Sequence, residues 1–307
     1  LSAEQLAQFR QNPAFFNESV TNPFAGLIPG NATLNAATIP RRLLLLPYPQ
    51  FGTVTQGLEN VGKIWYNALQ VQLEKRMSSG ITLVTSYTWS KAIGALTFLN
   101  DQDLEPTRAV TDDDRTHRLV LSGVWQLPFG KGRQFASSVN RATELLIGGW
   151  EYTWIANFQS GRPLNLPGNV DLIGDITAGS NGLDRYFNNC VRQLDGTSRQ
   201  PNAARSGFES CNNPAFAIRG PNTLRTIPLR SSQIRLPFRP QFDMGFNKNF
   251  NFSERVRFQV RLETFNTFNT PFFGGPNTDP NSPNFGFVNR DQANQPRNVQ
   301  LGFKLIF

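Results

Sequence analysis

The chain closes on Val299-Gln300-Leu301-Gly302-Phe303-Lys304-Leu305-Ile306-Phe307. Apolar side chains occupy alternate positions from Val299 to Phe307, with mostly small or polar residues between them. This period of two predicts a β-strand with one apolar and one polar face. Two interpretations are open at this point. One is the closing strand of a bacterial outer-membrane β-barrel, with its apolar face toward lipid, and the other is the half-buried last strand of a soluble β domain.

The composition excludes membrane-spanning helices but not a barrel. Of 307 residues 39% are hydrophobic, and the longest aliphatic run is Leu43 to Leu46. A transmembrane helix needs about 20 apolar residues, whereas a membrane strand needs apolar residues only at alternate positions. The net charge of +8 comes from Lys and Arg residues scattered along the chain, so we expect no nucleic-acid partner.

Six further segments show the same alternation. Their apolar positions, in chain order, are Trp65, Leu69, Val71 and Leu73; Ile81, Leu83, Tyr87 and Trp89; Leu119, Leu121, Trp125 and Leu127; Trp150, Tyr152, Trp154, Ala156 and Phe158; Phe242, Met244, Phe246 and Phe250; and Val256, Phe258, Val260 and Leu262. With the last strand they predict an all-β fold with about seven antiparallel membrane strands. Each segment alone also fits a soluble sandwich, because the polar face of a sandwich meets bulk water.

The lengths of the connections favour the barrel. Counted back from the last strand they are long (271–296), short (251–255), very long (161–240), moderate (128–149), long (91–116) and short (77–80). Outer-membrane barrels sort their connections in this way, with short periplasmic turns and long extracellular loops. We therefore expect residues 63–307 to form barrel strands and loops, residues 1–62 to form an extracellular loop region, and the protein to lie in the outer membrane of a Gram-negative bacterium.

Several local sequences resemble TonB-dependent outer-membrane receptors of the Oar-like group. The matching segments are Tyr66 to Arg76, Ser86 to Lys91, Arg115 to Gly123, Leu127 to Gly132, Gly148 to Trp150, Gln159 to Pro163, Phe246 to Phe250, Glu263 to Asn269 and the terminal Phe, with Asn22 to Phe24 and Pro47 to Phe51 upstream. The resemblance implies a precursor with a signal peptide, a plug domain that contacts the TonB system, and a barrel of roughly 22 strands. We expect this chain to be the C-terminal portion of such a barrel, without plug or signal peptide.

The alternation places five charged residues on the polar side of their strands, where we expect them to face the barrel lumen: Arg118, Glu151, Arg257, Arg261 and Glu263. They are interpreted either as the lining of a substrate path or as structural charges that pair with each other or with the plug. At the end of the chain, Phe303, Leu305 and Phe307 resemble the signal that the barrel assembly machinery reads.

Two further groups of residues allow chemical hypotheses. Cys190 and Cys211 lie in the longest connection, and in an exported protein we expect them to form a disulfide, with two free thiols as the alternative. The acidic run from Asp112 to Asp114 is interpreted either as a divalent-cation site or as loop carboxylates paired with neighbouring arginines. His117 is the only histidine, so a Ser-His-Asp or multi-histidine metal site is excluded, and we expect neither an enzyme nor a cofactor.

The leading functional hypothesis is TonB-dependent transport of a large solute, with this chain as part of the barrel wall and outer loops. One alternative is an outer-membrane adhesion or secretion-related surface protein without energised uptake. Another is a small closed barrel or soluble sandwich complete in itself. Ligand choice depends on the plug and loops, so the transported solute is not predicted.

Overall fold

The structure is a computed structural model, which describes every residue except 1–3, 5–7, 9–11, 13, 29, 33, 49–50, 52–56, 58–59, 203–206, 221–222 and 254. The chain divides into two compact units, Leu1–Asn60 and Val61–Phe307. Within the described residues no helix is both long and apolar enough to cross a membrane.

The first unit is built around a short antiparallel ribbon of β1 (Ser19–Thr21) and β2 (Thr38–Pro40), with the 3-10 helices η1 (Phe15–Asn17) and η2 (Arg41–Leu45) beside it. Asn22, which is buried, donates from its amide to the carbonyls of Leu34 (2.6 Å) and Ala36 (2.7 Å). These bonds close the loop between β1 and β2.

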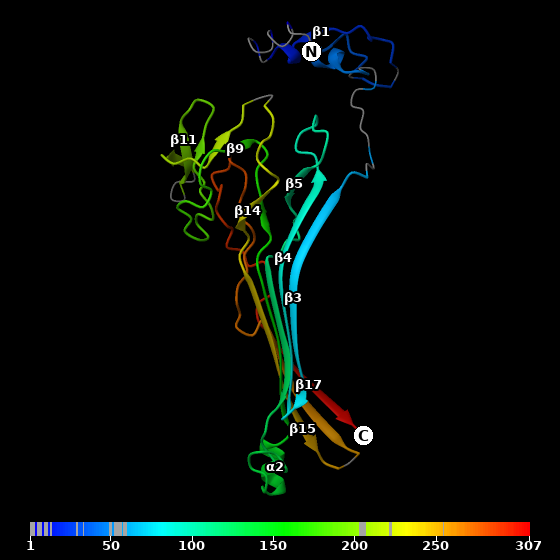
Figure 1. Cartoon of the computed structure of the whole chain (residues 1–307), viewed down its shortest axis with the longest axis vertical. Helices are drawn as coiled ribbons and strands as arrows, with labels where there is room; N and C mark the ends of the chain where they lie inside the picture. The colour runs from blue at the N-terminus through cyan, green and yellow to red at the C-terminus, as the bar shows by residue number, and fades with distance from the viewer. Residues whose placement is uncertain are drawn as a thin grey trace. The chain divides into compact units, whose positions relative to one another are not determined.

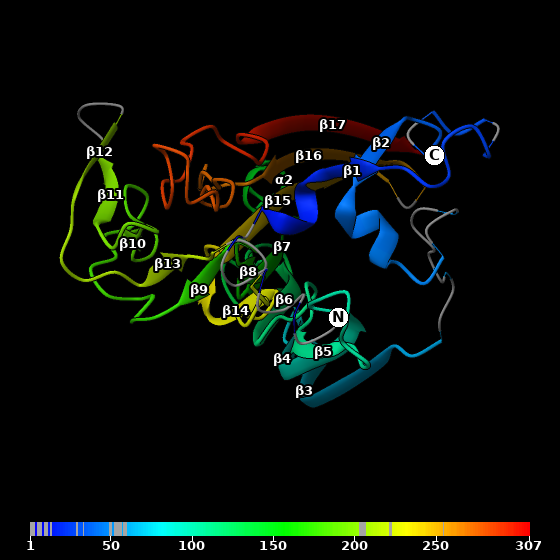
Figure 2. The ribbon, with the colours of Figure 1, turned by 90° about the horizontal axis from the view of Figure 1, so that it is seen from above.

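The second unit contains one large antiparallel sheet (Figure 1). Its strands are β3 (Lys63–Ser78), β4 (Ile81–Thr97), β6 (His117–Gln126), β7 (Trp150–Gln159), β15 (Arg239–Asn251), β16 (Arg257–Phe265) and β17 (Asn298–Ile306), and β5 (Thr107–Val110) pairs with the upper part of β4. The strands follow one another in space from β17 to β3 in sequence order (Figure 2). The all-β, antiparallel prediction is confirmed, but the sheet does not close on itself, because β17 and β3 form its two edges.

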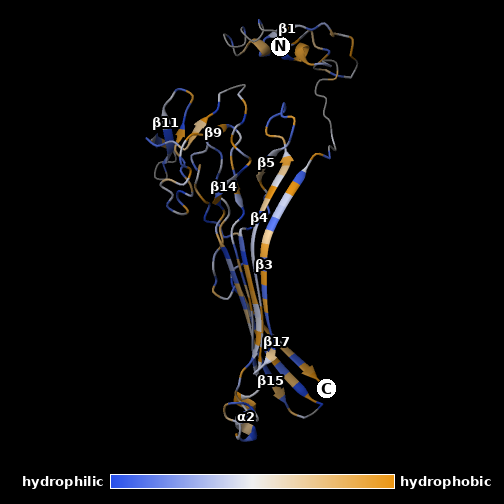
Figure 3. Cartoon of the chain, in the orientation of Figure 1, coloured by the Kyte–Doolittle hydropathy of each residue, from blue (hydrophilic) through white to orange (hydrophobic). Residues whose placement is uncertain are grey.

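The register sorts the side chains of the sheet onto two faces. Phe246 lies opposite both Tyr152 and Leu262, and Leu262 lies opposite Leu301, so the apolar positions of β7, β15, β16 and β17 share one face. The pairings of β3, β4 and β6 extend this apolar face across the sheet, and hydropathy alternates along the strands (Figure 3). Polar residues predominate on the opposite face, hereafter the polar face.

Connections at the two ends of the sheet differ as the sequence predicts. At one end, hereafter the short-turn end, β3 joins β4 through Ser79 and Gly80. Both residues have positive φ, as a two-residue type I′ hairpin requires. At the same end a short turn joins β15, which ends at Asn251, to β16, which begins at Arg257. The same end carries the connection from β6 to β7 with its helix α2 (Arg141–Ile147), where the Asn140 side chain accepts the N–H of Thr143 (2.8 Å). The three long connections lie at the other end.

Two of these long connections fold together into a loop module, here defined as residues 161–238 and 266–297. It contains β8 (Pro163–Asn165), β9 (Val170–Leu172), β10 (Val191–Arg192), β11 (Ser198–Asn202), β12 (Gly207–Ser210), β13 (Phe216–Ile218) and β14 (Arg230–Arg235). Strands β9 to β13 form a five-stranded sheet, and β8 pairs with β14. The sequence predicts none of these strands, nor β5, nor the extension of β4 to Thr97 through what was expected to be a loop.

The main hydrophobic core of the described chain lies in the loop module. Phe187, Phe216 and Phe285 are nearly inaccessible to solvent and pack edge to face, with ring centroids 5.0 to 5.9 Å apart. Phe285 comes from the β16–β17 connection and the other two come from the β7–β15 connection. The Asn189 amide donates to the Phe285 carbonyl (2.9 Å), and Val288 N donates to Leu183 O (2.8 Å). The two connections therefore form one packed body.

We predict that Phe285→Ala loosens the loop module, because removing a buried Phe ring costs about 3–5 kcal/mol. In the purified full-length gene product, trypsin should cleave between residues 183 and 236 faster than in the parent. Phe208→Ala is the matched control, since Phe208 is 37% exposed. Equal cleavage rates in the parent and the Phe285 variant would contradict the common core.

Candidate functional site

The polar face of the sheet is the first part of the candidate site. The register places Arg118, Glu151, Arg257, Arg261 and Glu263 together on this face. None of the five forms an ion pair within the described part of the chain. Glu151 instead accepts the amide of Asn247 (3.1 Å), and Arg261 donates to Gln259 (2.6 Å). The expected pairing of these charges with each other is therefore not seen.

Two recesses open on the polar face. One, of about 380 Å³, lies over the middle strands and is lined by Thr82, Ser122, Thr153, Asp243 and Glu263, among others. The second, of about 410 Å³, lies where β15 and β16 meet the β16–β17 connection. There the Arg239 guanidinium stacks on Phe272 (3.8 Å from Cζ to the ring centroid) beside Gln241 and Asn294. Both recesses offer mixed polar and aromatic surface to a ligand.

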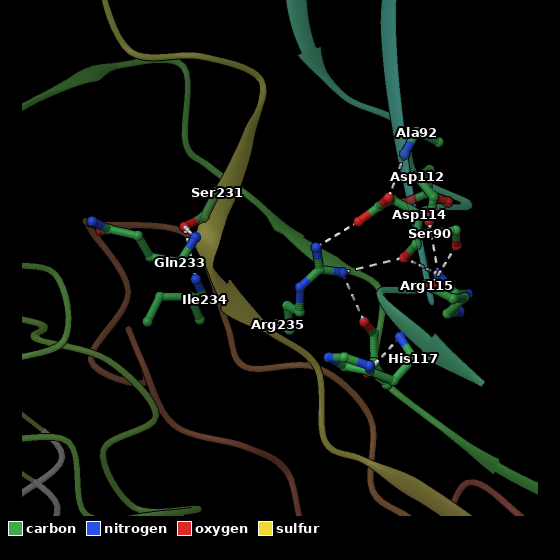
Figure 4. Close-up of polar contacts among 12 residues, drawn as sticks. Ser90, Ala92, Asp112, Asp114, Arg115, His117, Ser231, Gln233, Ile234 and Arg235 are labelled. Atoms are coloured by element: carbon green, nitrogen blue, oxygen red, sulfur yellow. Dashed lines mark hydrogen bonds and ion pairs between the residues drawn. The ribbon is translucent and has the colours of Figure 1, made fainter. Parts of the chain in front are cut away.

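An ion-pair cluster joins the loop module to the sheet (Figure 4). The carboxylate of Asp114, with a fully buried side chain, pairs with Arg235 of β14 at 2.5 Å and accepts the N–H of Ala92 in β4 (2.6 Å). Asp112 pairs with Arg162 (3.4 Å) and Arg230 (3.7 Å). The acidic run thus contacts arginines, as one of its two interpretations predicts, but these arginines come from the distant β7–β15 connection. In the described residues no three His, Cys, Asp or Glu side chains form a group that could hold a metal ion.

A second link lies at the tip of the connection after β4. The Asn100 side chain donates to Arg225 O (3.2 Å) and accepts Arg225 N–H (2.7 Å), which joins this connection to the loop module. The Arg225 guanidinium also donates to the carbonyls of Leu166 and Ile227. Burial, with the nearby charge of Arg219, lowers the pKa of Arg225. The loop module is therefore held to the sheet by polar contacts as well as by the chain itself.

The Cys190–Cys211 disulfide lies in the loop module, with its Cα atoms 6.1 Å apart. Tyr186 precedes Cys190 in the chain, and its hydroxyl donates to the carbonyl oxygen of Arg235 (2.7 Å), the residue whose side chain pairs with Asp114. Burial raises the pKa of Tyr186 to about 12, so this hydroxyl stays a neutral donor at physiological pH. The network extends from the module core to the ion pair at the sheet.

A comparison of the chain with protein families agrees with the observed pattern of strands and connections. The family model described as "Outer membrane beta barrel domain" matches residues 5–300, nearly the whole chain. The chain belongs to the outer membrane beta barrel domain family. The protein is accordingly located in the outer membrane of a Gram-negative bacterium. Neither the search of curated proteins nor that of solved structures found a match.

Membership in the outer membrane beta barrel family gives the two faces their meaning, because strands of such barrels turn apolar residues to lipid and polar residues to the lumen. Phe303 and Leu305 lie on the apolar face of β17, and Phe307, which follows β17, is 94% exposed. The role of these three residues in barrel assembly stays a prediction, as does the role of the five charges in a substrate path.

We predict that Arg235→Ala detaches the loop module from the sheet in this outer membrane beta barrel. Removing one partner of a buried ion pair leaves the Asp114 carboxylate without its counter-charge and costs about 3–5 kcal/mol. Hydrogen exchange should then accelerate at Ala92 and at residues 232–236. Arg290→Ala is the control, because its pair with Asp184 is exposed on both sides and is worth at most about 1 kcal/mol. Unchanged exchange at Ala92 would refute the role of the ion pair.

Proposed function

We propose that this chain forms part of the wall and the outer loops of a TonB-dependent transporter, which moves a large solute across the outer membrane. The proposal assigns no catalytic role to the chain. The observation that carries the proposal is the direction of the two edge strands. Six antiparallel steps separate β3 from β17, so these strands run in the same direction. A direct pair between them would be parallel, whereas bacterial single-chain barrels are antiparallel throughout.

Open sheet edges are not tolerated in the hydrocarbon of a membrane. The strand directions therefore favour a barrel completed by an odd number of further strands, outside the residues described. A barrel of roughly 22 strands fits this requirement and encloses a lumen wide enough to need a plug. The resemblance of the strand sequences to Oar-like receptors supports the same conclusion, with the plug as the contact to the TonB system.

The loop module supports a role in recognising the solute. Its core and its polar links to the sheet hold it in one arrangement, and the recess beside Arg239 lies between it and the polar face. A folded module would also serve an adhesin that binds a partner without energised uptake. The two hypotheses differ in their dependence on TonB, which the transport experiment below measures.

The first prediction of this proposal concerns orientation. An epitope inserted after Asn181, in the loop module, should be accessible to antibody on intact cells, because an exposed loop tolerates insertion. The same epitope after Ser253, in the β15–β16 turn, should bind antibody only after the outer membrane is opened. The reverse pattern would show that the long connections are not extracellular, and exposure of both epitopes would show that the two ends of the sheet do not lie on opposite sides of the membrane.

The second prediction concerns transport. In a comparison of spent growth media, at least one large solute should be consumed by the parent strain. It should remain in the medium of a strain lacking this gene and in that of a strain lacking TonB. A solute left only by the gene deletion would favour uptake that does not depend on TonB, and the absence of any such solute would favour adhesion or secretion.

A further inference from the structure

The short-turn end of the sheet is much more basic than the chain as a whole. It comprises residues 74–80, 127–149, 248–257 and 304–307, which include nine basic and three acidic residues, whereas the whole chain has 30 and 22. The basic residues are Lys75, Arg76, Lys131, Arg133, Arg141, Lys248, Arg255, Arg257 and Lys304. Such a local excess creates a positive potential that attracts anions.

Part of this charge is not used within the protein. The side chains of Lys75, Lys131 and Arg255 are exposed and form no hydrogen bond, ion pair or ring contact inside the described part of the chain. Of the acidic residues, Glu74 pairs with Arg76 (3.2 Å), and Glu144 accepts the backbone N–H of Lys131 (2.5 Å). In the described part of the chain these three side chains are therefore free for an external anion.

Exposed apolar side chains lie in the same turns. They are Met77, Phe129, Phe135, Leu146 and Phe252, of which Leu146 is 73% exposed. Turns that meet only water have no physical reason to expose so many large apolar groups. Basic and apolar side chains side by side are typical of protein surfaces that lie in the interface of an anionic membrane.

Hydrogen bonds hold these turns against the lipid-facing side of the sheet. Trp150, on the apolar face, donates from Nε1 to the carbonyl of Leu146 in α2 (2.9 Å). Arg141 of the same helix donates to Phe252 O (3.3 Å), and the Phe252 ring stacks on Phe250 of the apolar face, with centroids 6.4 Å apart. The α2 connection and the β15–β16 turn thus border the apolar face at the short-turn end of the sheet.

We propose that this collar, formed by Lys75, Lys131 and Arg255 with the exposed apolar residues beside them, binds the headgroups of anionic phospholipids in the leaflet that meets the short-turn end. Apolar side chains enter the boundary of the acyl chains and the cationic groups contact the phosphates. Each basic residue near an anionic surface strengthens binding roughly fivefold. The inference requires only that the chain is an outer membrane beta barrel and is independent of transport.

The test measures lipid affinity of the full-length gene product in non-ionic detergent. The dissociation constants of fluorescent phosphatidylglycerol and phosphatidylcholine are compared in mixed micelles. The parent should bind phosphatidylglycerol more tightly, and added salt should weaken only that binding. The triple variant Lys75→Gln, Lys131→Gln, Arg255→Gln should lose roughly a hundredfold in affinity for phosphatidylglycerol, because three factors of about five multiply.

The matched control is Lys63→Gln, Lys91→Gln, Arg192→Gln, which removes the same charge at the opposite end of the unit and should leave both affinities unchanged. Equal binding of the two lipids by the parent would overturn the proposal, as would an equal loss of affinity in both triple variants. Folding of the first triple variant is judged by heat-dependent migration in gels. If this variant does not fold, the lipid preference of the parent and its dependence on salt still test the proposal.

Discussion

Backbone hydrogen bonding in a medium without water is the constraint on which the rest of this structure depends. Each strand in the hydrocarbon must have its N–H and C=O groups paired with neighbouring strands. The ladders from β3 to β17 satisfy this requirement for all but the two edges. Because side chains alternate across a strand, a shift of β17 by one residue against β16 would turn Lys304 toward lipid and Phe303 toward the lumen. The register of backbone pairing and the polarity of the two faces of the sheet therefore determine each other.

The same constraint explains where the packed core lies. A sheet between lipid and lumen has no second protein layer against which to bury its apolar face, so that face stays largely exposed in the isolated chain. The loop module folds back on itself, and there Phe187, Phe216 and Phe285 form a buried cluster. Stability of the strands comes from the membrane and from pairing, and stability of the loop module comes from its own core.

The strands and the polarity of their faces were predictable from sequence, because alternation is a local property of each segment. Val260 and Leu262 show it without any knowledge of their neighbours. Local alternation fails in the C-terminal part of β4, where Ile93 is followed by Gly94 and Ala95, and the sequence did not predict this part of the strand. The module core was missed for another reason: Phe285 is about a hundred residues from Phe187, and neither connection has a period that marks a buried face. Likewise, nothing in the sequence near Asp114 identifies Arg235 as its partner.

A folded loop module also changes what its surface residues can do. A disordered connection must lose conformational entropy when it binds a solute, which weakens binding, whereas side chains on a module with its own core are already held in place. The stacked pair of Arg239 and Phe272 lies at the base of this module, and the same recess contains Gln241 and Asn298 at the ends of β15 and β17. Residues of the module and of the polar face thus line one continuous surface. If the chain is part of a transporter, as proposed, a solute bound there would already contact the polar face of the sheet, so recognition and entry would use the same preorganised set of side chains.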